Sequence, residues 1–320
     1  MRTPALGVVR PGPLSLIQDG GRRGVLHLGL SSAGAMDGES FAWANRLCGN
    51  AGAAPALEIA LGGLELEALG TVLVAITGPA AKLTINGQPA ATWQGQLLRP
   101  GDRLALGPAP RGGYLYLAVQ GGLATETAFG SAATVVREGL ARHPLATGDR
   151  LEVNPVADPP RRFALPAPLR PAFGSDGDSI SRLRVIPASP PGALPRALRR
   201  RFFDTLYRVG RHRDRMGYRL AGEPLEVPPL ALLSEPVVPG TIQLPPDGQP
   251  IVLMRDHQTL GGYPRLGTLL SLDRDRLARL APGDPLRFVP ITPGTAQRAL
   301  RAARRHYLAS CPVALDGEPL

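Results

Sequence analysis

The chain has 320 residues, which is long enough for two domains with separate hydrophobic cores. Only two cysteines, Cys48 and Cys311, are present, which excludes a disulfide framework and favours a reducing compartment. The formal net charge is +10, but Lys82 is the only lysine and the arginines are mostly scattered, as in proteins from GC-rich genomes. No basic strand carries the aromatic side chains that stack on bases, so nucleic-acid binding is excluded.

Several further classes of protein lack their sequence signals. No apolar run approaches the roughly 20 residues that span a bilayer, and segment 1–11 breaks too early for a signal peptide, so we expect a cytoplasmic protein. The single lysine rules out a Gly-x-x-x-x-Gly-Lys-Ser/Thr phosphate loop, and Lys82 lacks the setting of a biotin-carrying lysine. The histidines are widely spaced and no Gly-x-Ser-x-Gly elbow is present, so we expect no metal and no cofactor in this chain.

A first polar, glycine-rich stretch begins at Gln18 and Asp19 and continues to Asp37. Its glycines allow a backbone to approach a ligand closely or to take a positive φ. The residues after it have the apolar spacing of a short helix, for which Asp37 or Ser40 is the predicted N-cap. Capping accounts for Asp37 but not for Gln18 and Asp19.

Strand signals outnumber helix signals along the chain, which predicts a mainly β fold with a few helices. Three Gly-Asp turns, at 99–102, 146–149 and 281–284, each adjoin an apolar strand and weakly indicate two related β-rich barrels. Strands are predicted at 71–76, 114–119, 182–186, around Ile242 and at 251–253, and helices at 38–47, 195–206, 274–280 and 295–309.

A second polar stretch, residues 234–264, is the most informative part of the sequence. It alternates turn residues with two short strands and places polar side chains at the strand ends, where a scaffold presents them to a cleft. An ordinary surface hairpin needs turn residues and alternation only. It does not need Asp-His-Gln-Thr followed by Gly-Gly-Tyr-Pro.

Motifs in both stretches resemble those of the allophanate-hydrolase-subunit-2-like, or biotin-dependent carboxyltransferase, family. The resemblance runs from about Gly12 to Phe288. Ala33 and Leu260 depart from it, because the family often has serine and threonine there, so hydroxyl contacts are not carried over. The matching motifs are Gln18-Asp19, Ala33-Gly34-Ala35-Met36-Asp37, Leu57-Glu58-Ile59, Gly121-Gly122, Gly130-Ser131, Asp214-Arg215-Met216-Gly217-Tyr218-Arg219-Leu220, Ser234-Glu235-Pro236-Val237, Gly240-Thr241-Ile242-Gln243, Asp247-Gly248 and Gly261-Gly262-Tyr263-Pro264.

The resemblance implies two cyclophilin-like β-barrel domains. Together with composition, it predicts an N-terminal β-rich carboxyltransferase-like domain at 1–155 and a C-terminal cyclophilin-like barrel at 176–292. A proline-rich linker is predicted at 156–175 and a basic helical tail at 293–320.

The family includes the C subunit of the prokaryotic 5-oxoprolinase, half of the carboxyltransferase region of urea carboxylase, and the antagonist of a sporulation-kinase inhibitor. The preferred hypothesis is a non-ATPase subunit of an ATP-dependent 5-oxoprolinase, an amidohydrolase that opens the 5-oxoproline lactam to glutamate. It implies A-like and B-like partner subunits and a complex that uses ATP. No biotin-carrier segment or carboxylase domain accompanies the chain, which favours this reading.

Two alternatives remain open. One is the carboxyltransferase component of a biotin-dependent urea or related amide carboxylase, the only case that involves biotin. The other is a non-catalytic regulator that binds a partner protein. Neither membrane nor nucleic acid is an expected partner.

The candidate catalytic groups are the carboxylates Asp37, Glu58 and Asp256. Glu58 lies in an apolar strand, where a buried carboxylate requires either an ion pair or an acid/base role. Asp256 can instead cap a turn. The candidate substrate-binding residues are Gln18, Asp19, Arg215, Ser234, Gln243, Gln258, Thr259, Gly261, Gly262 and Tyr263.

Some of these candidates have structural explanations too. Arg215 can fork onto a substrate carboxylate or pair with Asp214 or another acid. The amides of Gln243 and Gln258 suit a lactam, a ureido group or a carboxylate. Tyr263 can pack between its proline and glycine neighbours. We also predict that the two polar stretches line one cleft, since amides and carboxylates beside glycines have no obvious use in a core.

Overall fold

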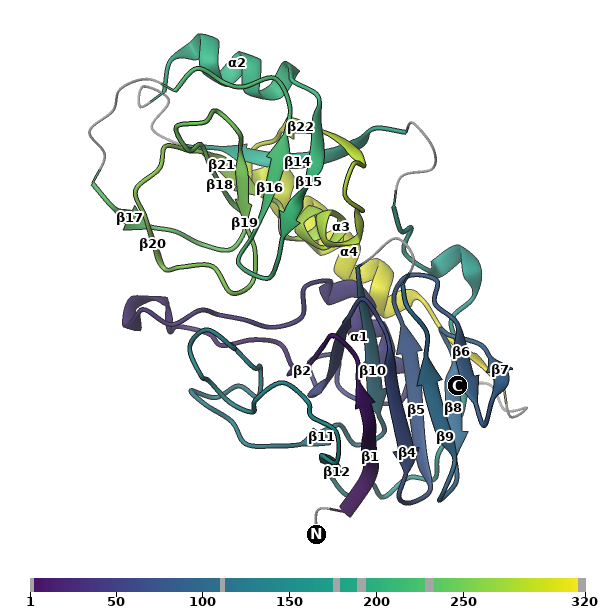
Figure 1. The fold of residues 1–320 in the computed structure, drawn as a ribbon. Coiled ribbons are helices and arrows are strands. Elements are labelled where there is room, and N and C mark those ends of the chain that lie inside the picture. Colours follow the sequence, from purple (N-terminus) through teal and green to yellow (C-terminus); the bar gives the residue numbers. More distant parts are fainter. Residues whose placement is uncertain (1–2, 110–112, 175–178, 189–193, 228–232, 316–320) are drawn as a thin grey trace. The chain divides into compact units, whose positions relative to one another are not determined.

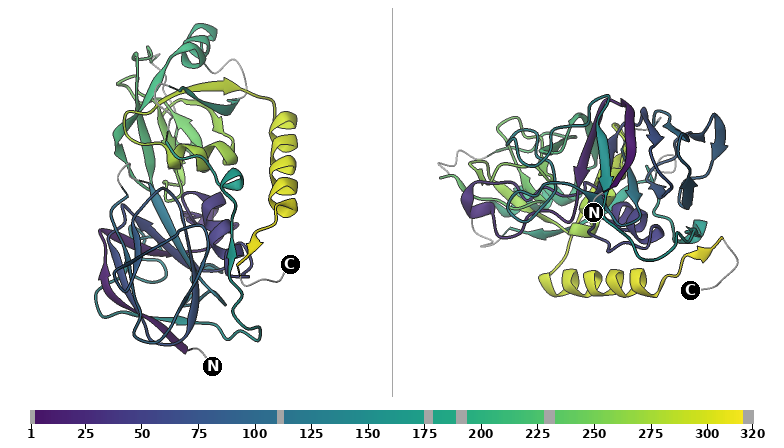
Figure 2. Two further views of the ribbon diagram at one scale, coloured as in Figure 1. Left: turned by 90° about the vertical axis from the view of Figure 1, so that its right-hand side faces the viewer. Right: turned by 90° about the horizontal axis from the view of Figure 1, so that it is seen from below.

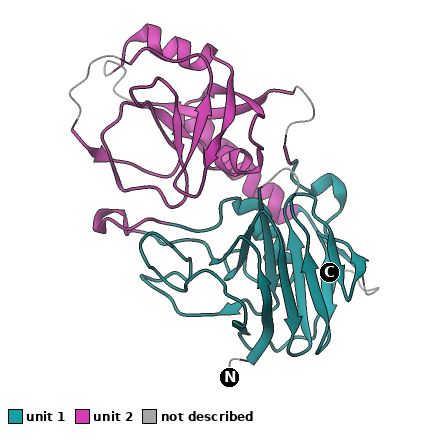
Figure 3. Cartoon of the chain, viewed as in Figure 1, with its two compact units in different colours: residues 1–23, 33–172, 310–320 teal, residues 24–32, 173–309 magenta. Residues whose placement is uncertain are grey.

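The structure, a computed structural model, describes residues 3–109, 113–174, 179–188, 194–227 and 233–315. Contacts divide the chain into two compact units (Figure 3): unit 1 comprises residues 1–23, 33–172 and 310–320, and unit 2 comprises residues 24–32 and 173–309. Strands outnumber helices in both units, which confirms the mainly β prediction (Figure 1).

The two units do not contain the same segments as the predicted domains. Much of the predicted linker belongs to unit 1, because Phe163 and Leu165 are buried and β13 (Phe163–Ala164) pairs with β23 (Val313–Ala314). The end of the predicted tail therefore joins unit 1, while residues 24–32 join unit 2. Residues 1–2, 175–178 and 316–320, at the ends of the predicted ranges, lie outside the described residues.

Unit 1 contains a seven-stranded and a five-stranded antiparallel sheet that share one apolar core (Figure 1). All six residues of β5 (Val72–Thr77) are buried, as expected for a continuous apolar run in an inner strand. The seven-stranded sheet has the order β11 (Leu123–Ala124), β12 (Arg150–Val153), β1 (Thr3–Pro11), β4 (Leu64–Ala68), β9 (Arg103–Leu106), β6 (Leu83–Ile85), β7 (Gln88–Ala90). The five-stranded sheet has the order β2 (Leu14–Gln18), β3 (Ala56–Ala60), β10 (Tyr114–Val119), β5, β8 (Gly95–Leu98).

Helix α1 (Gly38–Leu47) packs against β10, β5 and β3. It begins at the predicted N-cap, since Asp37 has an extended backbone and its Oδ1 accepts the Ser40 N–H at 3.3 Å. The apolar face predicted from the sequence is buried, with Phe41 and Trp43 each at most 3% exposed. Both the helix and its cap are therefore confirmed.

Unit 2 is built on a closed seven-stranded barrel. Strand β22 (Pro285–Pro290) pairs in parallel with β14 (Ser181–Pro187) and antiparallel with β15 (Tyr207–Arg213), which closes the barrel. The remaining barrel strands are β21 (Arg265–Leu269), β18 (Thr241–Gln243), β19 (Ile251–Leu253) and β16 (Gly217–Ala221), and a separate ladder joins β17 (Glu235–Pro236) to β20 (Leu260–Gly261). The two strands predicted in the second polar stretch are confirmed, and they form a hairpin in which β18 and β19 pair antiparallel with Gln243 opposite Ile251.

The helices of unit 2 are close to the predicted ones. Helix α2 (Arg196–Asp204) packs on β22, where the ring of Phe202 stacks on Phe288 with centroids 4.9 Å apart. Helix α3 (Ser271–Arg279) packs against β14, and α4 (Pro293–Ala309) is a single straight helix (Figure 2). In the described part of the chain, no helix combines the length and apolar character needed to cross a membrane. The described residues also include two 3₁₀ turns, η1 (Leu26–Leu28) and η2 (Ala167–Leu169).

The three Gly-Asp segments adopt the same turn. Their glycines have positive φ values of 86° at Gly101, 89° at Gly148 and 91° at Gly283, the conformation that glycine tolerates best. Each following aspartate accepts the backbone N–H three residues earlier, at 2.7 Å for Asp102, 3.0 Å for Asp149 and 2.8 Å for Asp284. The turns lead into β9, β12 and β22, so the three segments that are similar in sequence also have the same local structure.

Candidate functional site

Unit 2 contains a cavity of about 470 Å³ beside strands β15, β16, β18 and β19. This volume is within the range of sites that hold small molecules. The cavity brings together three predicted substrate-binding residues, Gln243, Gln258 and Tyr263. Its other lining residues are Arg211, His212, Arg213, Asp214, Met216, Gly217, Arg219, Ile251 and Leu253.

The cavity lining has an excess of positive charge. Arg213 Nη1 donates to the Leu280 carbonyl oxygen at 2.9 Å, and Arg219 forms an ion pair with Asp247. No acidic partner is found for Arg211 among the described residues. The carboxylate of Asp214 accepts the N–H groups of the following turn, at 2.8 and 3.1 Å. The lining therefore favours a ligand with a negative charge.

Two amide side chains meet in this cavity. Gln243 ends β18 and is 2% exposed, and Gln258 Nε2 lies 3.5 Å from Gln243 Oε1. Gly261 makes this arrangement possible, because a Cβ there would overlap Gln243 Nε2. A Cβ at Gly262 would meet Ser234 Oγ at an ordinary 3.5 Å. Tyr263 is 45% exposed at the cavity, so packing alone does not explain it.

Gly261 belongs to the small β17–β20 ladder, and Ser234, Thr259 and Gly262 each directly adjoin one of its strands. Glu235 lies opposite Gly261, and the Val237 N–H donates to the Thr259 carbonyl oxygen at 3.0 Å. Ser234 and Gly262 are exposed. The ladder holds the Gly-Gly-Tyr segment in place, and a direct substrate contact by Ser234 or Thr259 stays a prediction.

Arg215 pairs with Asp256 and not with its neighbour Asp214. Nε lies 2.7 Å from Oδ2 and Nη2 lies 2.8 Å from Oδ1, and each side chain is 8% exposed. Neither residue is among those that line the cavity. The pair agrees with the ion-pair explanation of Arg215, and the catalytic role of Asp256 stays a prediction.

In unit 1, Gln18 and Asp19 bind the segment that follows Gly130. Buried Gln18 donates through Nε2 to the Thr134 carbonyl oxygen at 2.9 Å. Asp19 Oδ1 accepts Ser131 Oγ–H at 2.6 Å, and its Oδ2 accepts the Ala132 N–H at 2.7 Å. These hydrogen bonds give a structural role to Gln18 and Asp19, which helix capping did not explain.

Glu58 and Asp37 share a buried network with Tyr116, a residue that the sequence analysis did not single out. Glu58 Oε2 accepts the Met36 N–H at 2.7 Å and the Tyr116 hydroxyl at 2.9 Å. That hydroxyl in turn accepts the Asp37 N–H at 2.8 Å. Burial, and then the charges of Glu58 and Asp37, raise the pKa of Tyr116 well above its ordinary value. A tyrosine inside an apolar strand was the available signal, because a buried phenol needs a partner.

The candidate residues are divided between the units. Gln18, Asp19, Asp37 and Glu58 belong to unit 1, and all the others belong to unit 2. The hypothesis of one shared cleft concerns residues of both units and stays a prediction.

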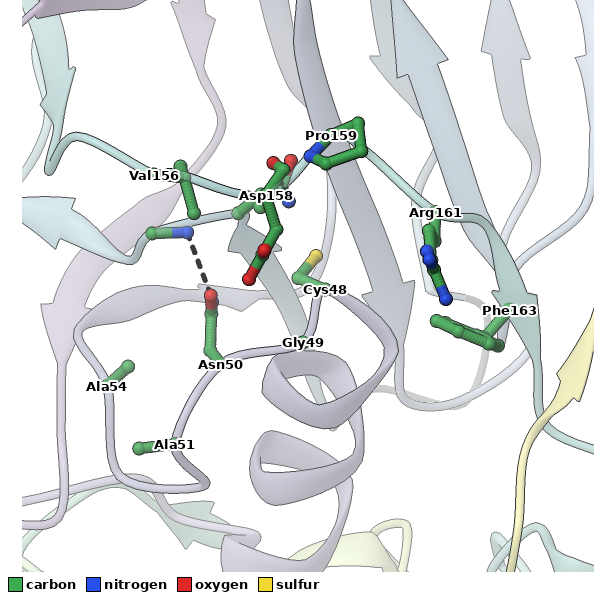
Figure 4. Close-up of a pocket in the computed structure, with 12 residues that line it drawn as sticks. Cys48, Gly49, Asn50, Ala51, Ala54, Val156, Asp158, Pro159, Arg161 and Phe163 are labelled. Atoms are coloured by element: carbon green, nitrogen blue, oxygen red, sulfur yellow. Dashed lines mark hydrogen bonds between the residues drawn. The ribbon is translucent and has the colours of Figure 1, made fainter. Parts of the chain in front are cut away.

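A second cavity, of about 620 Å³, lies in unit 1 and contains none of the predicted site residues (Figure 4). It adjoins the C-terminal end of α1, where Asn50 Oδ1 accepts the Gly121 N–H at 2.8 Å. Asp158, Arg161 and Phe163 line it from the segment predicted as a linker. No motif marked this cavity, because short stretches distant in sequence form it.

Comparisons with known proteins agree with the motifs. The family model for the carboxyltransferase domain, subdomain A and B, matches residues 28–290. The 5-oxoprolinase C subunit of Escherichia coli is 34% identical over 308 residues, which cover 94% of this chain and 96% of that protein. The 5-oxoprolinase C subunit of Haemophilus influenzae is 33% identical, over 91% of this chain and 92% of that protein. The crystal structure of Kluyveromyces lactis urea carboxylase matches 96% of this chain and 29% of its own, with 26% identity and a TM-score of 0.83. The chain therefore belongs to the carboxyltransferase domain family, as its motifs predicted.

Proposed function

We propose that this chain is the non-ATPase subunit of an ATP-dependent 5-oxoprolinase, which opens the 5-oxoproline lactam to glutamate together with A-like and B-like subunits. The observation that carries the proposal is the extent of similarity. The chain is 34% identical to the C subunit from Escherichia coli over 96% of that protein, against 26% identity to the urea carboxylase.

The cavity of unit 2 suits this substrate chemically. The anion of 5-oxoproline carries a carboxylate beside a lactam. Arg211 and Arg213 supply positive charge for the carboxylate, since guanidinium groups bind carboxylates with two parallel hydrogen bonds. The amides of Gln243 and Gln258 each offer a donor and an acceptor, which match the lactam C=O and N–H.

The chemistry requires different subunits of the complex to perform different steps. An amide is a poor electrophile, and phosphorylation of its oxygen would make attack by water feasible. The sequence of this chain has no phosphate-loop motif, so we assign ATP to a partner protein and substrate orientation to this chain.

Reconstitution tests the proposal. This chain is mixed with A-like and B-like subunits, ATP and 5-oxoproline, and glutamate release is followed. We expect release to require all components and to fall at least about tenfold with Gln258→Ala, the loss expected for one positioned hydrogen-bond donor. Arg287→Gln, at an exposed position of β22, is the control and should leave release unchanged. Glutamate release that does not depend on this chain would refute the proposal.

A carboxyltransferase component of a biotin-dependent amide carboxylase is the second candidate. It is supported by the family match and by the TM-score of 0.83 to urea carboxylase. Avidin separates the two activities, because it sequesters biotin and should abolish only the carboxylase. Partner binding without turnover in either reconstitution would favour the third hypothesis, a non-catalytic regulator.

A further inference from the structure

Two arginines of unit 2 share one carboxylate neighbour, since Arg255 contacts Asp275 and Arg274 directly precedes Asp275 on α3. Arg274 is on α3 and is 8% exposed, and Arg255 follows β19 with a side chain that is 17% exposed. Burial, and then the positive charge of Arg255, lower the pKa of Arg274 to about 9. Two like charges in a poorly hydrated place repel each other more strongly than at the surface.

One carboxylate offsets the two guanidinium groups. Asp275 Oδ1 lies 3.5 Å from Arg255 Nη2, and its charge partly restores the pKa of Arg274. The neighbouring Asp273 is held by two other arginines, since its oxygens contact Arg184 at 2.7 and 2.8 Å and Arg276 at 3.4 Å. The cluster of Arg255, Arg274 and Asp275 therefore keeps a net positive charge.

The donors of the two arginines are also incompletely used. In the described ranges, no residue accepts a hydrogen bond from the guanidinium group of Arg274, and its Nε is fully buried. Arg255 Nε is likewise buried without an acceptor there. Elsewhere in the unit a buried arginine is paired, as Arg215 is with Asp256. A buried cation without acceptors is costly, so the cluster is suited to an added anion.

We propose that Arg255 and Arg274 form a binding site for a small oxyanion, a carboxylate or a phosphate, whose oxygens accept from both guanidinium groups. Neither arginine lines the cavity assigned to the substrate, so the site is additional to the proposed function. An oxyanion with two or more oxygens satisfies both forks at once and supplies the missing negative charge.

Thermal unfolding of the full chain tests this site at constant ionic strength. We expect phosphate or acetate, titrated against sodium chloride, to raise the Tm saturably, by about 4 °C at one hundred times Kd. The two titrations distinguish the ligand classes. A response to only one of the two anions shows whether the site prefers a tetrahedral or a planar oxyanion. Arg274→Met should raise the Tm in anion-free buffer, since an unpaired buried charge is removed, and should abolish the anion response.

Arg287→Met is the matched control, since Arg287 is an exposed arginine of the same unit, and it should respond like the unmodified chain. Arg255→Met provides a second test that does not depend on how Arg274→Met folds. Its affinity for the anion should be weaker by at least about tenfold, as for a lost charged hydrogen bond. An unsaturated response that follows ionic strength alone, or one that persists in both variants, would overturn the proposal. The proposal would also be overturned if Arg274→Met had a lower Tm and the unmodified chain showed no anion response.

Discussion

Arg215 and Asp256 form a buried bidentate ion pair, with nitrogen–oxygen distances of 2.7 and 2.8 Å. The backbone N–H of Asp256 also donates to the Arg215 carbonyl oxygen at 2.7 Å. The two residues lie just outside β16 and β19, which pair with each other in the barrel. The pair therefore fixes the loop that leads from β19 to Gln258.

We expect Asp256→Asn to lower the free energy of unfolding by about 3–5 kcal/mol, because Arg215 would keep a buried charge without its partner. Asp204→Asn is the control, since the Arg200–Asp204 pair is exposed and should lose at most about 1 kcal/mol. Urea denaturation measures both variants. Equal losses would mean that burial adds nothing to the Arg215–Asp256 pair.

Tyr116→Phe should lower the free energy of unfolding by about 1–3 kcal/mol, because the Asp37 N–H and a Glu58 oxygen both lose a buried partner. Phenylalanine keeps the ring and its edge-to-face contact with Phe41, so packing changes little. Denaturant unfolding near pH 7 measures the loss. An unchanged stability would show that the hydroxyl is not part of the network.

The same variant should alter the stability at alkaline pH. The pKa of Tyr116 is raised in the folded state, whereas an unfolded tyrosine ionises near pH 10. Its contribution is therefore complete below about pH 10 and is lost as the pH rises towards the folded value. Tyr116→Phe should reduce the alkaline slope by up to about 1.4 kcal/mol per pH unit. Burial raises the pKa of Tyr207 as well, so part of the slope should remain.

Gly261→Ala should impair ligand binding in the cavity of unit 2, because the new Cβ would displace the Gln243 amide. Gly262→Ala is a closely matched control, since its Cβ would meet only an ordinary contact with Ser234. Isothermal titration of 5-oxoproline, or glutamate release in the reconstituted system, compares them. We expect at least a tenfold weakening for Gly261→Ala only, about the value of one lost amide hydrogen bond. Two equal affinities would argue against a role of Gln243 in the site.

The two cysteines should differ in reactivity. Cys48 is 2% exposed and burial raises its pKa, whereas Cys311 is exposed. Because the thiolate is the reactive form, a thiol reagent at pH 8 should modify Cys311 rapidly and Cys48 only after denaturation. Cys311→Ser should then show no fast phase. A fast reaction in that variant would mean that Cys48 is reached through the neighbouring cavity of unit 1.

The sequence by itself determined the local elements and the family. Turn residues and apolar periodicity located α1, its Asp37 cap and the strands β18 and β19, because caps, turns and alternation are properties of neighbouring residues. The motif order identified the carboxyltransferase domain family. The three Gly-Asp turns were likewise visible, since a positive φ and an aspartate acceptor need only four consecutive residues.

Tertiary structure alone decided which polar groups meet. Asp256, not the adjacent Asp214, is the partner of Arg215, and Tyr116 completes the network of Glu58. Strand pairing also placed residues 163–164 of the predicted linker against residues 313–314. The excess charge of Arg255 and Arg274 was equally hidden in the sequence. These outcomes depend on which distant segments lie side by side and on how deeply water is excluded there, and neither follows from the order of residues along the chain.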